Sequence, residues 1–135
     1  MNVHRAWKRD DNDDQNELFA ESGEVIYGSF YNPKDDLFYT GANICPGWLA
    51  VRSELGSSPK FCFGVLVRFC DRRSGVAFPS LTDFARAQGI TVRAVSKQLA
   101  KLEANDLIHV TQVGNGKNNE YRFLQHPWMD EYVSN

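Results

Sequence analysis

The chain has 135 residues, of which 42% are hydrophobic and 24% are charged, and its formal net charge is −2 at pH 7. This length and composition favour one globular domain with extensions, and they exclude collagen-like, largely disordered and multidomain chains. No apolar run of about 18 residues is present to span a bilayer, and the N-terminal residues are rich in charge. We therefore expect a cytoplasmic protein with no secretory signal and no membrane partner.

The charge is unevenly distributed along the chain. Residues 1–45 carry four Lys/Arg and nine Asp/Glu, and residues 46–126 carry eleven and six. The first part is therefore acidic and the second basic, and two more acids lie in the last nine residues. A basic body with acidic extensions fits nucleic-acid binding, although domains that bind no nucleic acid can be equally basic. The expected units are a flexible acidic tail at 1–22, a hairpin-like extension at 23–45, a body at 46–126 and a C-terminal tail at 127–135.

The extension at 23–45 is expected to be a β-hairpin. Strand-forming residues occupy 25–31 and 37–40, and the segment between them contains Pro33 and other turn formers. A lone hairpin is only marginally stable, so this one should pack on the body or on a second copy of the chain. A strap over the core and a dimer contact are both open at this point.

The first helix of the body is predicted to begin at Ser58 and Pro59, because serine caps helices and proline suits their first turn. It should end near Asp71, and a very short strand should follow over 75–78. Its expected core face has spacings of three and four residues. The residues on that face are Phe61, Cys62, Val65, Leu66 and Phe69.

Two further helices are predicted around Gly89. Ser80 with Asp83 three residues later is typical of a capping box and predicts a second helix over 81–88, with Leu81, Phe84 and Ala85 inward. Gly89 should end it, and Thr91 should cap a third helix that runs to Asn105.

The third helix has two different faces. One should be buried, and the other is basic and follows a short turn that contains glycine, which is the arrangement that enters a DNA major groove. The core face comprises Val92, Val95, Leu99 and Leu102, and the outward face comprises Arg93, Ser96, Lys97, Ala100 and Lys101.

Two strands are predicted after this helix, over 107–113 and 120–124, joined by turn-forming residues at 114–119. The segment from Phe78 to Leu124 resembles the winged helix-turn-helix of bacterial regulators and of plasmid or phage replication proteins. The matching motifs are Phe78-Pro79-Ser80, Gly89-Ile90-Thr91, Val92-Arg93-Ala94-Val95-Ser96-Lys97, Leu99-Ala100-Lys101-Leu102-Glu103, Leu107-Ile108 and Asn119-Glu120-Tyr121-Arg122.

The resemblance implies an α+β fold of three helices and a β-wing, here with the N-terminal β-hairpin as an extension. It also implies that residues 91–105 form a recognition helix in the major groove and that the wing, 107–124, lies on the phosphate backbone or in the minor groove. Ala94 stands where the family often has a hydroxyl residue, which removes one hydrogen bond to DNA. The implied groove residues are Arg93, Ala94, Lys97 and Gln98, with Thr91 and Ser96 near the phosphates; Lys101, Lys117, Arg72 and Arg73 are added as basic candidates.

The function expected from this pattern is sequence-specific binding of double-stranded DNA by a homodimer. The size of the chain favours a transcriptional regulator or an accessory factor of plasmid or phage DNA replication. The alternative is a winged-helix module that binds a protein and no DNA, with the extension at 23–45 as its contact region. Its docking surface would contain the aromatic residues Tyr27, Phe30, Tyr31, Phe38 and Tyr39.

Neither enzymatic activity nor a bound metal or cofactor is expected. The three cysteines are odd in number and lack Cys-x-x-Cys spacing, so they predict free thiols. The three histidines fall on separate segments, where no two could share a metal or serve a nucleophile. These residues are Cys45, Cys62, Cys70, His4, His109 and His126. A short helix at 126–132 is expected to pack on the body or on a second protomer.

Overall fold

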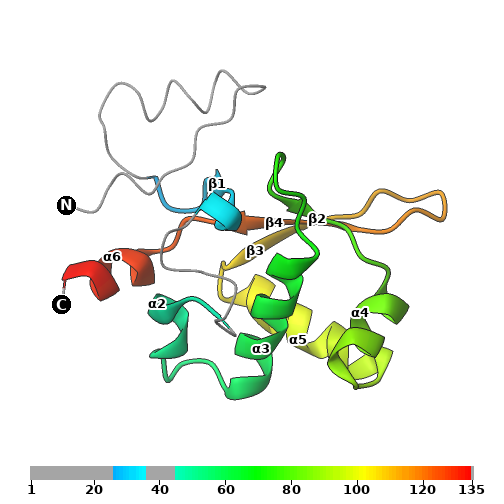
Figure 1. Ribbon diagram of the computed structural model, residues 1–135, viewed down its shortest axis with the longest axis horizontal. Coiled ribbons are helices and arrows are strands. Elements are labelled where there is room, and N and C mark those ends of the chain that lie inside the picture. The colour runs from blue at the N-terminus through cyan, green and yellow to red at the C-terminus, as the bar shows by residue number, and fades with distance from the viewer. Residues whose placement is uncertain (1–25, 36–44, 135) are drawn as a thin grey trace.

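An antiparallel sheet carries α-helices on one side in the part of the chain that the computed structural model describes, residues 26–35 and 45–134 (Figure 1). This part is a small α+β domain. Its five α-helices are α2 (Gly47–Ala50), α3 (Ser57–Arg68), α4 (Leu81–Gln88), α5 (Val92–Ala104) and α6 (Pro127–Ser134). The strands are β1 (Phe30–Tyr31), β2 (Val76–Ala77), β3 (Ile108–Thr111) and β4 (Glu120–Leu124), and a 3₁₀ turn, η2, spans Pro33–Asp35.

Strand β4 is the centre of the sheet. Arg122 pairs with His109 of β3 and with Val76 of β2, so β2 and β3 lie on opposite edges of β4. Phe123 likewise pairs with β3 and with Tyr31 of β1. Strands β1 and β2 therefore follow one another along one edge of β4, and β3 occupies the whole of the other edge.

The extension at 23–45 differs from the expected hairpin where it is described. Its strand is only two residues long, and its partner is β4 of the body. The second expected strand, at 37–40, and the acidic tail at 1–22 lie outside the described residues. Backbone hydrogen bonds from Gly28 to the Gln125 carbonyl and from Gln125 to the Ser29 carbonyl hold this segment against the end of β4. The described part of the extension is therefore a strap that packs on the body.

Asn32 fastens the strap to the turn before β2. Its side chain is only 2% exposed; Nδ2 donates to the Arg72 carbonyl at 2.7 Å and Oδ1 accepts from the Lys34 amide at 3.0 Å. Gly75, in the same turn as Arg72, has a φ of +75°, and a Cβ there would lie 3.1 Å from Asn32 Cβ. Only glycine satisfies both the backbone conformation and the close approach of Asn32.

Gly75→Ala is expected to lower the free energy of unfolding by about 1 kcal/mol more than Gly116→Ala does. Gly116 has the same φ of +75° but nothing within 4 Å of its added methyl group. Both variants carry the backbone strain of a left-handed alanine, and only the first also displaces Asn32. Urea unfolding of the two variants measures the difference. Equal losses would show that the strap makes no close contact at Gly75.

Helix α3 is shifted and rotated relative to the prediction. It begins at Ser57 after Gly56, which makes no side-chain cap, so Ser58 lies inside the first turn. It ends at Arg68, before Asp71, because Cys70 already forms an isolated bridge with Ala77 beside β2. The predicted face was wrong at two positions, since Phe61 and Phe69 are exposed. The buried residues of α3 are Pro59, Cys62, Phe63, Gly64, Leu66 and Val67.

The prediction around Gly89 is confirmed in its caps. Ser80 Oγ accepts from the Asp83 amide at 3.0 Å, Gly89 takes a left-handed φ of 71° and Thr91 Oγ1 accepts from the Ala94 amide at 3.1 Å. The short strand β2 and strand β4 also match the sequence analysis. Val92 was wrongly placed in the core: it is 41% exposed, because the first turn of α5 extends past the core, which begins at Val95.

Aromatic contacts join the elements of the core. The ring of Phe63 on α3 lies edge to face with Trp48 on α2, at 5.9 Å between centroids, and with Phe123 on β4, at 5.2 Å. Phe123 in turn meets Tyr31 of the strap at 6.4 Å. Helix α6 packs against α2 and buries Met129, so the C-terminal helix packs on the body. Within residues 26–35 and 45–134, every helix is too short or too polar to cross a membrane.

Candidate nucleic-acid interface

The outer face of α5 carries a row of exposed cations. Arg93, Lys97 and Lys101 are four residues apart, so they follow one another along one side of the helix. None of the three side chains forms an ion pair or hydrogen bond with another residue of the described part of the chain. Glu103 is the one acid on α5. We call Arg93, Lys97 and Lys101 the cation row.

The buried side of α5 fixes the direction of this row. Val95, Leu99 and Leu102 are buried in the core, where α5 packs against α3 and α4. Ser96 and Ala100 are exposed between the cations. The helix therefore presents a polar surface on a rigid support, because rotating it would expose the three apolar side chains to water.

The remaining α5 candidates are less accessible than the cation row. Thr91 is exposed, but its hydroxyl oxygen is occupied as the helix cap. Ala94 is half-buried. Gln98 is also half-buried, and its amide oxygen is buried without a hydrogen-bond partner. In this conformation Gln98 cannot present the amide oxygen that pairing with adenine requires, which departs from the role expected of it.

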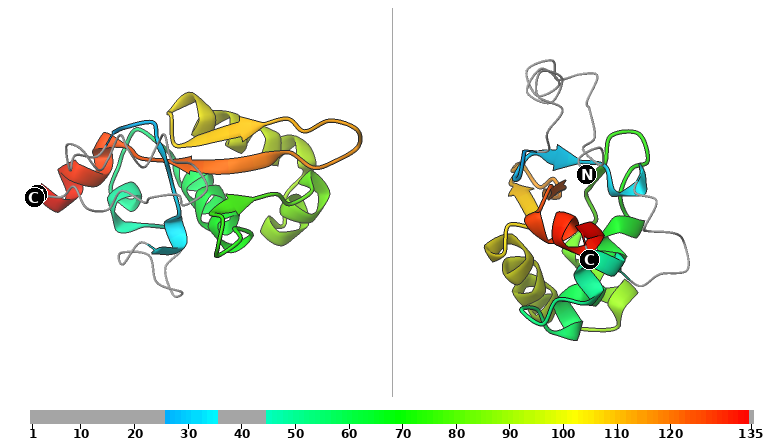
Figure 2. Two further views of the ribbon diagram at one scale, coloured as in Figure 1. Left: turned by 90° about the horizontal axis from the view of Figure 1, so that it is seen from above. Right: turned by 90° about the vertical axis from the view of Figure 1, so that its left-hand side faces the viewer.

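The loop between β3 and β4, residues 112–119, extends from the body at the end of the molecule where α4 lies (Figures 1 and 2). Lys117 is exposed near its tip, next to a turn in which its amide donates to the Gly114 carbonyl. Asn118 Nδ2 donates to the Phe78 carbonyl at 3.1 Å. That bond joins the loop to the segment that leads into α4.

Arg72 and Arg73 lie elsewhere. Their turn, residues 71–75, is on the side of the sheet away from α4 and α5 (Figure 1). Asp71 Oδ2 accepts from the Ser74 amide at 2.8 Å and from the Arg73 amide at 3.2 Å, and these bonds lower the pKa of Asp71. The structure brings Thr91, Arg93, Ser96, Lys97 and Lys101 together on α5 and leaves Arg72 and Arg73 on a separate surface.

Arg86 is a candidate that the sequence analysis missed. It is exposed in the last turn of α4 and pairs with Asp83 one turn earlier, at 3.1 Å. The capping box at Ser80 was the available signal, because it fixes the phase of α4 and turns positions 82, 83 and 86 outward. Arg86 places a further cation on the helix that precedes α5.

Other kinds of site have less support in the described residues. Tyr31 is buried in the core, so it does not contribute to the aromatic docking surface expected there; Tyr27 is exposed, Phe30 is half-buried, and Phe38 and Tyr39 lie outside the described residues. Burial raises the pKa of the Cys62 thiol to about 12, which leaves it without thiolate character at neutral pH.

Within residues 26–35 and 45–134, no group of three or more His, Cys, Asp and Glu side chains could hold a metal ion. The cation row on α5 is therefore the candidate site that we consider further. Its positive charge favours an anionic partner. In comparisons with known proteins, no family model, curated protein or solved structure matches this chain.

Proposed function

We propose that this protein is a sequence-specific double-stranded DNA-binding protein of the winged helix-turn-helix type, with α5 in the major groove. The observation that carries the proposal is the cation row, Arg93, Lys97 and Lys101, which is exposed and forms no ion pair within the described residues. The row lies on the second of two helices joined by a short turn, the usual setting of a recognition helix.

The dimensions of α5 support this proposal. Its 13 residues correspond to a length of about 20 Å, and a major groove about 12 Å wide accepts an α-helix. Arg93 and Lys97 are near the N-terminal end, from which recognition helices contact base edges. Arginine and lysine can pair with guanine, and the cations that do not reach a base can contact phosphates.

The loop at 112–119 acts as the wing in this proposal. Lys117 would contact a phosphate or the minor groove next to the segment that α5 occupies. The hydrogen bond between Asn118 and the Phe78 carbonyl supports such a role, because it holds the loop at the same end of the molecule as the start of α4.

In this proposal the protein binds DNA as a homodimer. One module of this size reads only a few base pairs, and two copies on a repeated site supply the affinity and length that specific recognition needs. Such a protein acts in the cytoplasm, as a transcriptional regulator or as an accessory factor of DNA replication in a plasmid or phage.

The test is fluorescence anisotropy of the full chain with labelled duplex fragments from its own locus, at several salt concentrations. We expect saturable binding to one fragment, with a logarithmic salt slope of about −0.9 for each phosphate contacted. Absence of binding at low salt would overturn the proposal and favour the protein-binding module.

Lys117→Ala is expected to make the logarithmic salt slope of DNA binding shallower by about one for each protomer bound. The alanine removes one phosphate contact and leaves the loop intact, because Lys117 contributes its backbone amide to the turn. Arg72→Ala is the matched control, since it removes an exposed cation on the other side of the sheet. An unchanged slope in Lys117→Ala would remove the wing from the interface.

A further inference from the structure

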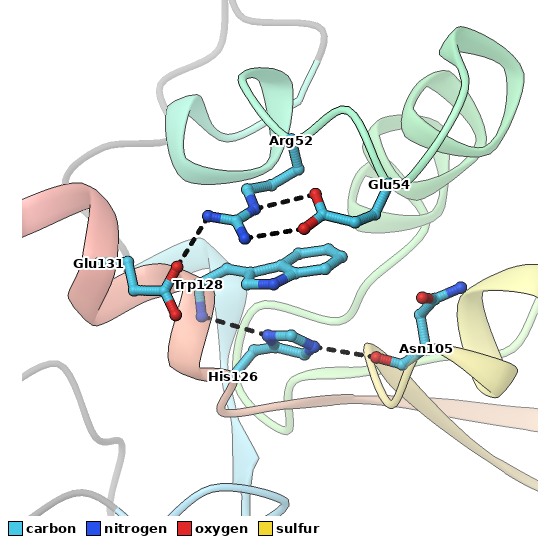
Figure 3. A network of polar contacts seen from close by, with 6 residues as sticks. All are labelled: Arg52, Glu54, Asn105, His126, Trp128 and Glu131. Carbon is cyan, nitrogen blue, oxygen red and sulfur yellow. Dashed lines mark hydrogen bonds and ion pairs between the residues drawn. The ribbon is translucent and has the colours of Figure 1, made fainter.

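His126 is a buried histidine between β4 and α6, and its two ring nitrogens have different partners (Figure 3). Nε2 lies 2.9 Å from the Asn105 carbonyl at the end of α5, and Nδ1 lies 3.2 Å from the Trp128 amide nitrogen of α6. A carbonyl can only accept and an amide N–H can only donate, so Nε2 carries the proton and Nδ1 accepts. One neutral tautomer therefore satisfies both partners.

Two tryptophans enclose the imidazole. The Trp128 ring lies 4.3 Å from it and the Trp48 ring 6.5 Å from it, the latter nearly parallel at 17°. The Arg52 guanidinium covers the other face of Trp128 at 4.8 Å, and ion pairs of 3.0 and 2.8 Å join it to Glu54 and Glu131 (Figure 3). The cluster links the end of α2, the first turns of α6 and the end of α5.

The Asn105 carbonyl, at the end of α5, needs a hydrogen-bond donor from outside the helix. The last carbonyls of a helix lack partners within it. Here the Asn105 side chain donates to the Lys101 carbonyl at 2.9 Å, and His126 Nε2 donates to the carbonyl of Asn105 itself. Lys101 is the last residue of the cation row. The imidazole is thus bonded to the backbone one turn beyond the last residue of the cation row.

We propose that His126 is a positioning residue for α5: its neutral imidazole holds the end of the helix against α6, and one added proton releases that hold and weakens DNA binding. The proposal rests on the DNA-binding function proposed above. The proton comes from solvent and binds at Nδ1. The ring then presents an N–H to the Trp128 N–H, so the contact with α6 is lost and the buried imidazolium must move towards water.

Burial and neighbouring charges from several elements shift the pKa of His126. Burial is the largest influence and lowers the pKa of His126 below its ordinary value of 6.5, and Arg52 after α2 acts in the same direction. The Asn105 carbonyl, Asp106 after α5 and Glu131 on α6 raise it. Because the folded pKa is the lower one, the neutral clamp is intact above pH 6.5 and is lost as the pH falls through the folded pKa.

The direction of the pH effect distinguishes this clamp from general electrostatics. Acidification makes a protein more positive overall, and that added charge on its own would strengthen binding to DNA. The clamp instead predicts weaker binding in acid. A loss of affinity on acidification therefore requires a specific group whose protonation opposes binding.

The experiment compares the full-length chain with His126→Gln and His109→Gln by DNA anisotropy at about pH 7.5 and about pH 5.5, at constant ionic strength. Glutamine can donate to the Asn105 carbonyl and accept from the Trp128 amide, but it does not titrate. We expect the unmodified protein and His109→Gln to lose about tenfold in affinity, the effect of one buried hydrogen bond, and His126→Gln to stay within about twofold. Equal or tighter binding of the unmodified protein in acid, or an undiminished loss in His126→Gln, would overturn the clamp.

A second readout needs no DNA. In a Trp7→Phe background the remaining tryptophans are Trp48 and Trp128, both beside His126, and an imidazolium quenches indole emission. We expect a fluorescence step below pH 6.5 that His126→Gln removes. Absence of this step in a protein that binds DNA overturns the clamp alone. A step in a protein that binds no DNA at any pH overturns the DNA-binding function, and with it the effect of the clamp on binding.

Discussion

Lys97→Glu is expected to weaken site-specific DNA binding by about 100-fold or more, while Arg73→Glu weakens it by less than about threefold. Both substitutions change the net charge by the same amount. Lys97 is the middle of the cation row, and a carboxylate there would face phosphates and base edges in the groove. Arg73 is exposed on the other side of the sheet, so its reversal changes only the distant field of the protein.

Anisotropy at one fixed, moderate salt concentration measures both variants on the fragment that the unmodified protein prefers. Circular dichroism and the urea midpoint should be unchanged in Lys97→Glu, because the exposed side chain makes no ion pair or hydrogen bond within the described residues. If the two reversals reduce affinity equally, binding follows net charge and α5 has no special role.

The parts of the fold that could be predicted from the sequence are those with local signals. Ser80, Gly89 and Thr91 each act on backbone groups within a few residues, so they define α4, the turn and α5 without reference to the rest of the chain. The alternating residues of β4 likewise fix which of its side chains are buried. The cation row followed directly from the phase of α5.

The features that the sequence did not indicate depend on contacts between distant parts of the chain. The strap pairs with β4 nearly one hundred positions later, and no property of Phe30 or Tyr31 specifies that partner. Helix α2 is only four residues long and depends on packing against α6, so it carries no periodic pattern. Arg72 and Arg73 were grouped with the DNA contacts by charge alone, and charge does not determine on which side of a sheet a turn lies.

The clamp around His126 was missed for the same reason. Its members come from three separate parts of the sequence, and each of them alone is typical of an ordinary surface or core position. The clamp is recognisable only from the two hydrogen bonds of one ring and the two tryptophans beside it.

The run of apolar residues in α3 does not determine which face of the helix is buried. Phenylalanine occurs at 61, 63 and 69, and several inward faces satisfy a spacing of three and four residues. The structure buries Phe63 completely and leaves Phe61 42% exposed. Two neighbouring residues of the same type therefore have opposite environments on one helix.

Phe63→Ala is expected to lower the free energy of unfolding by about 3–5 kcal/mol, and Phe61→Ala by about 0.5 kcal/mol or less. The first variant leaves a cavity among Trp48, Phe123 and the rest of the core. The second removes a ring that is already half in water, and alanine is the better helix former. Urea unfolding followed by circular dichroism gives both values, and the dependence on urea should have the same slope in each.

These losses are large against the stability of a domain of this size, about 5–15 kcal/mol in total. Phe63→Ala should therefore bring the protein close to unfolding at 37 °C and reduce DNA binding through the unfolded fraction, whereas Phe61→Ala should bind as the unmodified protein does. The reverse order of the two losses would mean that α3 is rotated by about one residue, with the face predicted from the sequence turned inward. That rotation would also move Cys62 and Leu66 relative to α4 and α5, and it would change the support on which the cation row depends.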